Sequence, residues 1–220
     1  MERARLGSMT WTDLDDPIVV VPVGSCEQHG PHLPLDTDTI IATALADDLA
    51  ARRHDCVVAP PLAITASGEH HGFPGTLSLG TEVMTTLVVE LARSADWATG
   101  VVFVNGHGGN ITAMQRAGDV FEHERREVLL WWPHLPDGDP HAGHTETSLM
   151  LALAPDLVRF DRAESGPIPA MVDLVRHGVQ PLSPNGVLGD PAGATADAGA
   201  RIFERLADHL AAAVDDWATA

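Results

Sequence analysis

Short apolar runs recur along the chain and predict buried strands. Each run is rich in branched aliphatic side chains and is followed by turn residues or a polar loop. Continuous apolar stretches of this length are typical of strands that are buried on both faces. The four runs are residues 18–21, 56–59, 101–104 and 128–132.

Longer segments between and after these runs have apolar residues at helical spacing. In the first predicted helix, Asp47, Asp48 and Arg52 form the expected polar face. Because strands and helices alternate, we expect an α/β fold with a mostly parallel sheet flanked by helices on both faces. A chain of 220 residues can build this as a single domain over residues 1–220. The predicted helices are residues 39–53, 81–98, 111–125, 145–153 and 198–217.

Residues 164–195 break this pattern. The segment is rich in proline and glycine, and only residues 171–176 have a helical pattern. A long irregular segment in a compact domain is usually functional or part of an interface. We therefore expect it to contact the site or another copy of the chain.

Composition excludes several classes of protein. With 45% hydrophobic residues the chain is not generally disordered. Thirteen Lys and Arg against 31 Asp and Glu give a net charge of −18, which disfavours nucleic acid and anionic membranes as partners. Cys26 and Cys56 are too few for a disulfide framework. The start of the chain has no apolar core of a signal peptide, and no run reaches membrane length, so we expect a cytoplasmic protein.

Ligand-type residues gather in loops that follow the predicted strands. In open α/β sheets, ligands bind at the carboxyl ends of the strands. In an extended backbone Glu27 and His29 project to the same side, and Asp38 returns to the pocket later. One such loop alone is equally well explained as a solvated polar surface. Three loops with carboxylates and imidazoles favour a divalent metal such as zinc, manganese or iron(II). The loops are residues 23–39, 105–110 and 141–148.

The motifs in these loops resemble the creatininase (creatinine amidohydrolase) family. They read Gly-Ser-Cys-Glu-Gln-His-Gly-Pro-His-Leu-Pro at 24–34, Asn-Gly-His-Gly-Gly-Asn at 105–110 and Glu-Thr-Ser at 146–148. The resemblance covers roughly residues 18–192. Within the family, the segments 66–76 and 141–148 are most similar to the peptidases of mycofactocin biosynthesis. The resemblance implies the family's α/β fold and a homo-oligomer, as a hexamer.

The resemblance also implies two divalent metal ions per chain. Glu27, Asp38 and His107 would hold one ion, and His29 and Asp38 the other, so that Asp38 bridges the two. Creatininase itself has a metal-binding glutamate two residues after the histidine of the second loop, where this chain has Gly109. We expect Glu146 to replace it. The alternative for Glu146 is a helix-start carboxylate that is stabilised by the helix dipole and free amides.

The resemblance assigns catalysis to His141, which would pass a proton to the leaving amine, and to Glu146. Ser67, Glu69 and His70 are expected to face the substrate and not the metal. Trp131 and Trp132 are also expected to form the substrate pocket, although strand alternation sends the two rings to opposite faces and leaves one in the core.

The resulting hypothesis is a metal-dependent hydrolase of C–N bonds. Resemblance narrows the substrate to the modified mycofactocin precursor peptide, from which a C-terminal dipeptide derived from valine and tyrosine would be released. One alternative is another creatininase-family hydrolase that acts on a cyclic amide or a formamide. A second is a non-catalytic metal-binding subunit. A thiol hydrolase using Cys26 is less favoured, because the nearby histidines are better explained as metal ligands.

Overall fold

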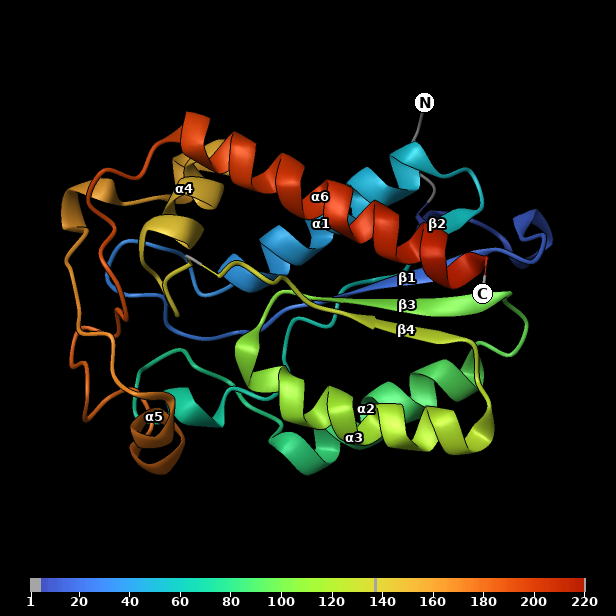
Figure 1. Cartoon of the computed structure of the whole chain (residues 1–220), viewed down its shortest axis with the longest axis horizontal. Helices are drawn as coiled ribbons and strands as arrows, with labels where there is room; N and C mark the ends of the chain where they lie inside the picture. The colour runs from blue at the N-terminus through green and yellow to red at the C-terminus, as the bar shows by residue number, and fades with distance from the viewer. Residues whose placement is uncertain (1–4, 137, 220) are drawn as a thin grey trace.

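The structure is a computed structural model that describes residues 5–136 and 138–219. Its centre is a four-stranded sheet in the order β2-β1-β3-β4, and all neighbouring strands run parallel (Figure 1). The strands are β1 Ile18–Val23, β2 Cys56–Val58, β3 Gly100–Asn105 and β4 Val128–Trp131. The expected parallel sheet is confirmed. The expectation of one domain over residues 1–220 stays a prediction, and its ends lie outside the described residues.

Helices cover both faces of the sheet, which confirms the predicted α/β class (Figure 1). On one face lie α1 Thr37–Arg52, α4 His144–Leu153 and α6 Ala196–Ala218. On the other lie α2 Thr81–Ser94 and α3 Ile111–Glu124. The short helix α5 Met171–His177 lies outside these layers. The 3-10 turns are Leu6–Ser8, Trp11–Asp13, Gly68–His70 (η3), Gly108–Asn110 (η4), Pro155–Leu157 and Phe160–Arg162.

The continuous apolar runs are explained by this double covering. Successive strand residues point to opposite faces, so Val20 packs under α1 and α6 while Val19 packs over α2 and α3. Helix α6 contributes Leu206, Leu210 and Val214, all buried. Burial of each such side chain stabilises the fold by about 1.5–3 kcal/mol.

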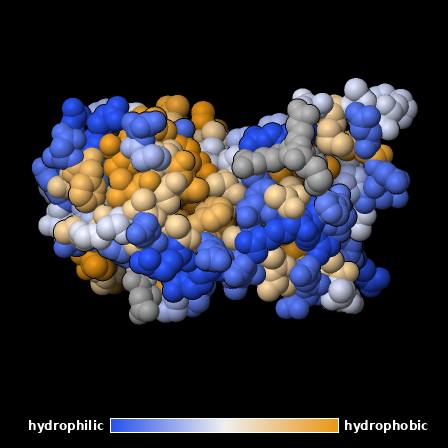
Figure 2. Space-filling model, turned by 90° about the horizontal axis from the view of Figure 1, so that it is seen from above, coloured by the Kyte–Doolittle hydropathy of each residue, from blue (hydrophilic) through white to orange (hydrophobic). Residues whose placement is uncertain are grey.

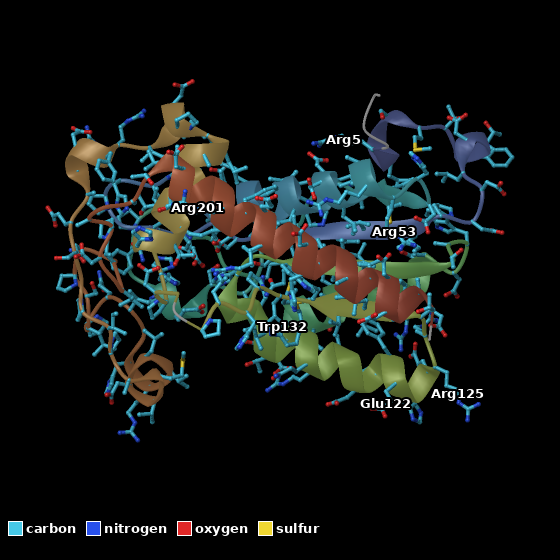
Figure 3. The ribbon with its side chains drawn as sticks, turned by 45° about the horizontal axis from the view of Figure 1, so that its top comes forward. Arg5, Arg53, Glu122, Arg125, Trp132 and Arg201 are labelled. Carbon is cyan, nitrogen blue, oxygen red and sulfur yellow. The ribbon has the colours of Figure 1, made fainter. Side chains whose placement is uncertain are left out.

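One expectation about the polar face of α1 was wrong. Asp47 is buried, with 3% of its surface exposed, and its carboxylate accepts a hydrogen bond from the guanidinium of Arg5, which is labelled in Figure 3. Helical spacing placed Asp47 opposite the apolar stripe, but a residue 42 positions earlier covers that part of the helix. The predicted bounds of the strands and helices differ only slightly from the observed ones. The largest difference is at α2, which ends at Ser94 instead of residue 98.

The loops at the carboxyl ends of β1, β3 and β4 meet at one end of the sheet, at the left in Figure 1. Figure 2 shows apolar side chains gathered on the upper face at this same end, where α4 lies. No helix within residues 5–136 or 138–219 has the length and hydropathy to cross a bilayer. The fold thus brings the ligand-rich loops together, as their positions after the strands predicted.

Candidate functional site

Asp38 lies at the centre of the site. Its Oδ1 is 3.1 Å from His29 Nε2, and its Oδ2 is 3.1 Å from His107 Nδ1. Ser25 Oγ donates a hydrogen bond to Oδ2 at 2.8 Å. Asp38 and the two histidines are all buried. His29 comes from the loop after β1, Asp38 from the start of α1 and His107 from the loop after β3.

The local backbone explains how Asp38 reaches this position. Asp38 is in the first turn of α1, where the helix dipole favours a carboxylate. The helix start packs directly on the end of β1, because a Cβ at Gly24 would lie 2.2 Å from Thr39 Oγ1. Thr39 Oγ1 also donates a hydrogen bond to the Ser25 carbonyl at 3.0 Å. The glycine after the strand is therefore required by a close approach of the two backbone segments.

Two groups of ligand-type residues share Asp38. We call Glu27, Asp38 and His107 the inner group, and His29, Asp38 and Glu146 the outer group. Within each group, one potential ligand atom per residue lies within 4.8 Å of the others. Glu27, His29, Asp38 and His107 are the residues that the family resemblance assigned to two metal positions, and Glu146 is the expected replacement for the missing family glutamate.

Glu146 joins the outer group from the first turn of α4. Its Oε2 lies 3.9 Å from His29 Nε2 and accepts a hydrogen bond from the Ala142 amide at 2.6 Å. Ala142 has a φ of 54°, a left-handed conformation that aims its N–H back at the helix start. Glu146 thus accepts an amide hydrogen bond near the start of α4 while lying close to His29, so its role as a metal ligand stays a prediction.

Hydrogen bonds fix which nitrogen of each histidine is free for a cation. His29 Nδ1 donates to the Glu27 carbonyl at 3.1 Å, so the lone pair of Nε2 faces Asp38. His107 Nε2 donates to the Ala66 carbonyl at 2.9 Å, so the lone pair of Nδ1 faces Asp38. A nitrogen lone pair that faces a buried carboxylate requires a cation between them, which is either a proton or a metal.

The environment of Glu27 also indicates that the site binds a cation. It is fully buried, and neither carboxylate oxygen has a hydrogen bond within the part of the chain that the structure describes; Oε2 has only an ion-pair contact, with His107 Nε2 at 3.1 Å, and Oε1 has only ion-pair contacts, the closer with His70 Nε2 at 3.3 Å. Buried carboxylates are normally paired or bound to metal. Carboxylate and imidazole ligands at these positions fit a borderline divalent cation such as zinc, iron(II) or manganese.

The pKa values show how protons would fill the site without a metal. Burial lowers the pKa of His29, but the charge and hydrogen bond of Asp38 outweigh burial and raise it to about 10. Burial raises the pKa of Glu27 to about 7 against the opposing charge of His107. Burial also raises the pKa of Glu146 to about 7, opposed by His29. Metal binding here would displace protons, because imidazole ligates in its neutral form.

His141 lies against the two groups without belonging to the predicted ligands. Its ring lies between those of His29 and His70, with ring centroids 4.3 and 4.4 Å away and the ring planes tilted by 37° and 47°. Burial, with the charges of His29 and His70, lowers the pKa of His141 well below its usual value, so the ring is neutral. Its Nδ1 is 3.8 Å from Glu27 Oε1. This places a proton-accepting nitrogen at the edge of the cluster.

Gln28 organises the histidines on this side of the site. Its Oε1 accepts from the Gly30 amide at 2.8 Å, and its Nε2 donates to the Gly186 carbonyl at 3.0 Å. His141 Nε2 donates to the Gln28 carbonyl at 2.8 Å, so the remaining amide proton of Gln28 goes to His70 Nδ1, also at 2.8 Å. His70 therefore carries its proton on Nε2, the nitrogen 3.3 Å from Glu27 Oε1.

The irregular segment 164–195 backs the site through its main chain. The Val179 amide donates to the Glu69 carbonyl at 2.8 Å. Leu188 and His141 exchange two backbone hydrogen bonds, at 2.9 and 3.3 Å, and Gly186 supplies the carbonyl that Gln28 meets. One inner part of this segment therefore lies behind the histidines.

The structure separates the two tryptophans. Trp131 is buried, and its Nε1 donates to His209 Nδ1 on α6 at 3.0 Å, which places it in the core. Trp132, labelled in Figure 3, lines a cavity of about 200 Å³ together with His107 and Glu146. Strand alternation explains the difference, and it leaves Trp132 as the tryptophan beside the cluster.

Two of the residues expected to face substrate, Glu69 and His70, lie next to the inner group. Ser67 and His70 are buried, and Glu69 Oε1 lies 3.4 Å from His107 Nε2. Cys26 is half-buried, and its thiol contacts the Gly75 carbonyl at 3.6 Å. A carbonyl does not activate a thiol, whereas a nucleophilic cysteine needs an imidazole or another cation beside it.

The sequence reasoning missed two residues that shape the site. One is Gln28, which lies between two predicted ligands. The other is Asp139, whose carboxylate accepts from the amides of His144 and Thr145 at the start of α4. The signal for Asp139 was its place beside Pro140 before a predicted helix, since aspartate caps helix starts.

Together, the fold and the cluster define an α/β protein with a candidate metal site at the carboxyl ends of its strands. A model of the creatininase family, described as creatinine amidohydrolase, matches residues 7–214. The chain therefore belongs to the creatininase family, and it is a hydrolase of amide C–N bonds. The resemblance seen in its motifs is confirmed.

Similar sequences include several peptidases. The mycofactocin precursor peptide peptidase of Mycobacterium tuberculosis is 49% identical over 230 residues, covering 97% of this chain and 91% of the relative. Its namesake in Mycolicibacterium smegmatis is 47% identical over 225 residues, covering 96% and 91%. Creatinine amidohydrolase of Pseudomonas putida is 31% identical over 199 residues, covering 74% and 76%.

Solved creatininase structures share the fold. A mutant creatininase described as the Zn-Zn type superposes with a TM-score of 0.83 at 26% identity, covering 98% of both chains. A creatininase described as the Mn form gives 0.79 at 26% identity, again covering 98% of each chain. These structural neighbours carry zinc or manganese, the metal types that the donor set of this chain suits.

Proposed function

We propose that this chain is a metal-dependent peptidase that hydrolyses the modified mycofactocin precursor peptide and releases its C-terminal dipeptide derived from valine and tyrosine. The identity of 49% to a mycofactocin precursor peptide peptidase, over nearly the whole chain, supports the substrate. The observation that best supports the chemistry is Asp38, whose two oxygens each face an imidazole of a different ligand group at 3.1 Å.

The proposal places one divalent ion in each group. Glu27, Asp38 and His107 would hold one ion and His29, Asp38 and Glu146 the other, with Asp38 common to both. When bound, a pair of such ions supplies an activated water and polarises the scissile carbonyl. The chain contributes the fixed geometry, because Ser25 holds Asp38 and the Ala142 amide holds Glu146.

His141 handles the proton in this proposal. Its Nε2 proton is committed to the Gln28 carbonyl, so Nδ1 is the nitrogen that takes up a proton from the attacking water. As the C–N bond breaks, His141 delivers that proton to the leaving amine nitrogen. The low pKa of this buried imidazole favours its return to the neutral form.

Trp132 provides the substrate contact in this proposal. Its ring lines the cavity that opens beside His107 and Glu146. A C-terminal group derived from tyrosine would stack on an indole there, and such aromatic pairs contribute about 0.5–1.5 kcal/mol beyond area burial. Trp131 is left out, because its indole is committed to the core.

Mass spectrometry of the modified precursor after incubation with zinc-loaded protein tests the proposal. We expect release of the C-terminal dipeptide. His141→Ala should keep the metal content and lower kcat by about 10²–10⁴-fold, the usual contribution of general acid–base catalysis. An intact peptide alongside turnover of a cyclic amide or formamide would favour the other family activities. Metal binding without turnover of any of them would favour a binding subunit.

Two further expectations from the sequence accompany this proposal. The homo-oligomer, as a hexamer, stays a prediction that light scattering at micromolar concentration checks. The cytoplasmic location also stays a prediction, and fractionation of the producing cells checks it.

A further inference from the structure

One 3-10 turn, η3, reaches two members of the inner group with two consecutive side chains. Glu69 Oε1 lies 3.4 Å from His107 Nε2, and His70 Nε2 lies 3.3 Å from Glu27 Oε1. Asp38, the third member, is held by Ser25 instead. Every residue of the inner group therefore has a polar side chain behind it.

Gly109 makes room for this contact. A Cβ at position 109 would lie 2.0 Å from Glu69 Oε1 and 2.4 Å from His107 Nε2. A Cβ at the neighbouring Gly108 would meet nothing within 4 Å. The carboxylate of Glu69 thus occupies the space where a side chain at position 109 would begin. A glutamate at 109 and the observed position of Glu69 are mutually exclusive.

The turn is fixed from several sides. The Val179 amide donates to the Glu69 carbonyl at 2.8 Å, and a Cβ at Gly178 would lie 2.9 Å from the same carbonyl. The side-chain amide of Gln28 holds His70 Nδ1 at 2.8 Å. With both its backbone and one imidazole anchored, η3 presents Glu69 and His70 in defined orientations.

The charges of the two side chains suit their neighbours. His70 bears its proton on the nitrogen that faces Glu27, a buried carboxylate that has no hydrogen bond among the residues described. Glu69 brings a carboxylate to the inner group from the same turn. It faces the N–H side of His107.

We propose that Glu69 and His70 are positioning residues for the metal position of the inner group, and not the substrate contacts that the sequence suggested. The carboxylate of Glu69, 3.4 Å from His107 Nε2, attracts the N–H that the Ala66 carbonyl also accepts, which keeps Nδ1 turned toward Asp38. His70 Nε2, 3.3 Å from Glu27 Oε1, turns its N–H toward the Glu27 carboxylate and so favours its orientation. The inference rests on the proposed metal centre, and it assigns the support to one of its two positions.

The inference predicts that removing Glu69 or His70 weakens metal binding at one of the two positions only. In the described part of the chain, no hydrogen bond or ion pair joins Glu69 or His70 to His29 or Glu146 of the outer group. Loss of either side chain should therefore weaken the ion of the inner group and spare that of the outer group, apart from any effect through Asp38.

A chelator titration of zinc-loaded protein tests this. We expect two dissociation events in the wild-type protein, and Glu146→Gln identifies the one that belongs to the outer group. Glu69→Ala and His70→Ala should each weaken the other event by about 10–100-fold, the usual effect of losing a group that orients a metal ligand. Glu69→Gln, which keeps an acceptor oxygen, should lose less. His71→Ala, an exposed neighbour of the same turn, is the matched control.

The outcomes separate this inference from the proposed function. Unchanged zinc affinity in folded Glu69→Ala and His70→Ala, with a raised KM, would overturn it and restore the substrate role. Equal weakening of both events would also overturn it. If Glu69→Ala fails to fold, as judged by circular dichroism, Glu69→Gln and His70→Ala decide. Wild-type protein that binds no zinc would instead reject the proposed metal centre itself.

Discussion

The inner and outer groups share Asp38 but are built differently. The inner group is almost wholly buried, and it comes from the loops after β1 and β3, the two central strands, and from the first turn of α1. The outer group adds Glu146, whose side chain is 19% exposed and whose position depends on α4 and the loop before it. The inner group is therefore closed off in the centre of the fold, whereas part of the outer group reaches solvent.

Removal of the Asp38 carboxylate should abolish metal binding at both groups. Because one carboxylate faces both imidazoles, we expect Asp38→Ala to bind neither ion and to lose activity. Elemental analysis of the purified variant measures this. Asp36→Ala is the control, since Asp36 is exposed in the same loop. A full complement of metal in Asp38→Ala would show that the bridge does not exist.

A methyl group at position 109 should weaken the inner group. In Gly109→Ala the new Cβ would collide with Glu69, with His107 and with the Ala66 carbonyl, which lies 2.5 Å away. We expect zinc affinity of the inner group to fall by about 10–100-fold, as when an orienting contact is lost. Gly108→Ala, where the space is open, should leave it unchanged. Equal behaviour of the two variants would contradict this reading of the loop.

Asp139 offers the converse test on the outer group. Its carboxylate caps the amides at the start of α4, the helix that carries Glu146. Loss of a helix cap costs about 0.5–2 kcal/mol. We therefore expect Asp139→Ala to lower the melting temperature and to weaken zinc at the outer group, while the inner group keeps its affinity. The chelator titration measures both, and loss confined to the inner group would count against it.

The smallest expected effects come from the two tryptophans. Trp132→Ala should raise KM for a substrate with an aromatic end by about 2–13-fold, corresponding to about 0.5–1.5 kcal/mol, and leave zinc binding unchanged. Trp131→Ala should mainly lower thermal stability, because it opens a cavity under α6. Steady-state kinetics and thermal melts distinguish the two. If both variants keep the wild-type KM, the aromatic contact lies elsewhere.

Local patterns were enough to predict the layers of the fold and the meeting of the loops. Apolar runs identify strands such as β1 because a strand that is covered on both faces has no polar side. The approach of Glu27, His29 and Asp38 followed from one short loop. These features depend on neighbours in sequence, or on the rule that parallel strands end at the same edge.

The errors and omissions involve partners that are distant in sequence. Asp47 looked like a surface residue because its partner, Arg5, lies outside the helix. Gln28 joins Gly186, which is 158 positions away, and no local pattern shows this. The role of Glu69 depends on the absence of a side chain at Gly109, which is visible only when the two loops are seen together.

The support that residues 164–195 give to the site passes through main-chain groups. Val179 and Leu188 contribute amides, and Gly186 and Leu188 contribute carbonyls. Since almost any amino acid supplies the same N–H and C=O groups, most side chains there can change while the support persists. A scan of alanine substitutions would thus report the exposed positions of the segment as dispensable, but not Gly186, where a Cβ would lie 1.8 Å from Gln28 Oε1. Replacing single peptide bonds by esters would show how much the histidines depend on the main chain behind them.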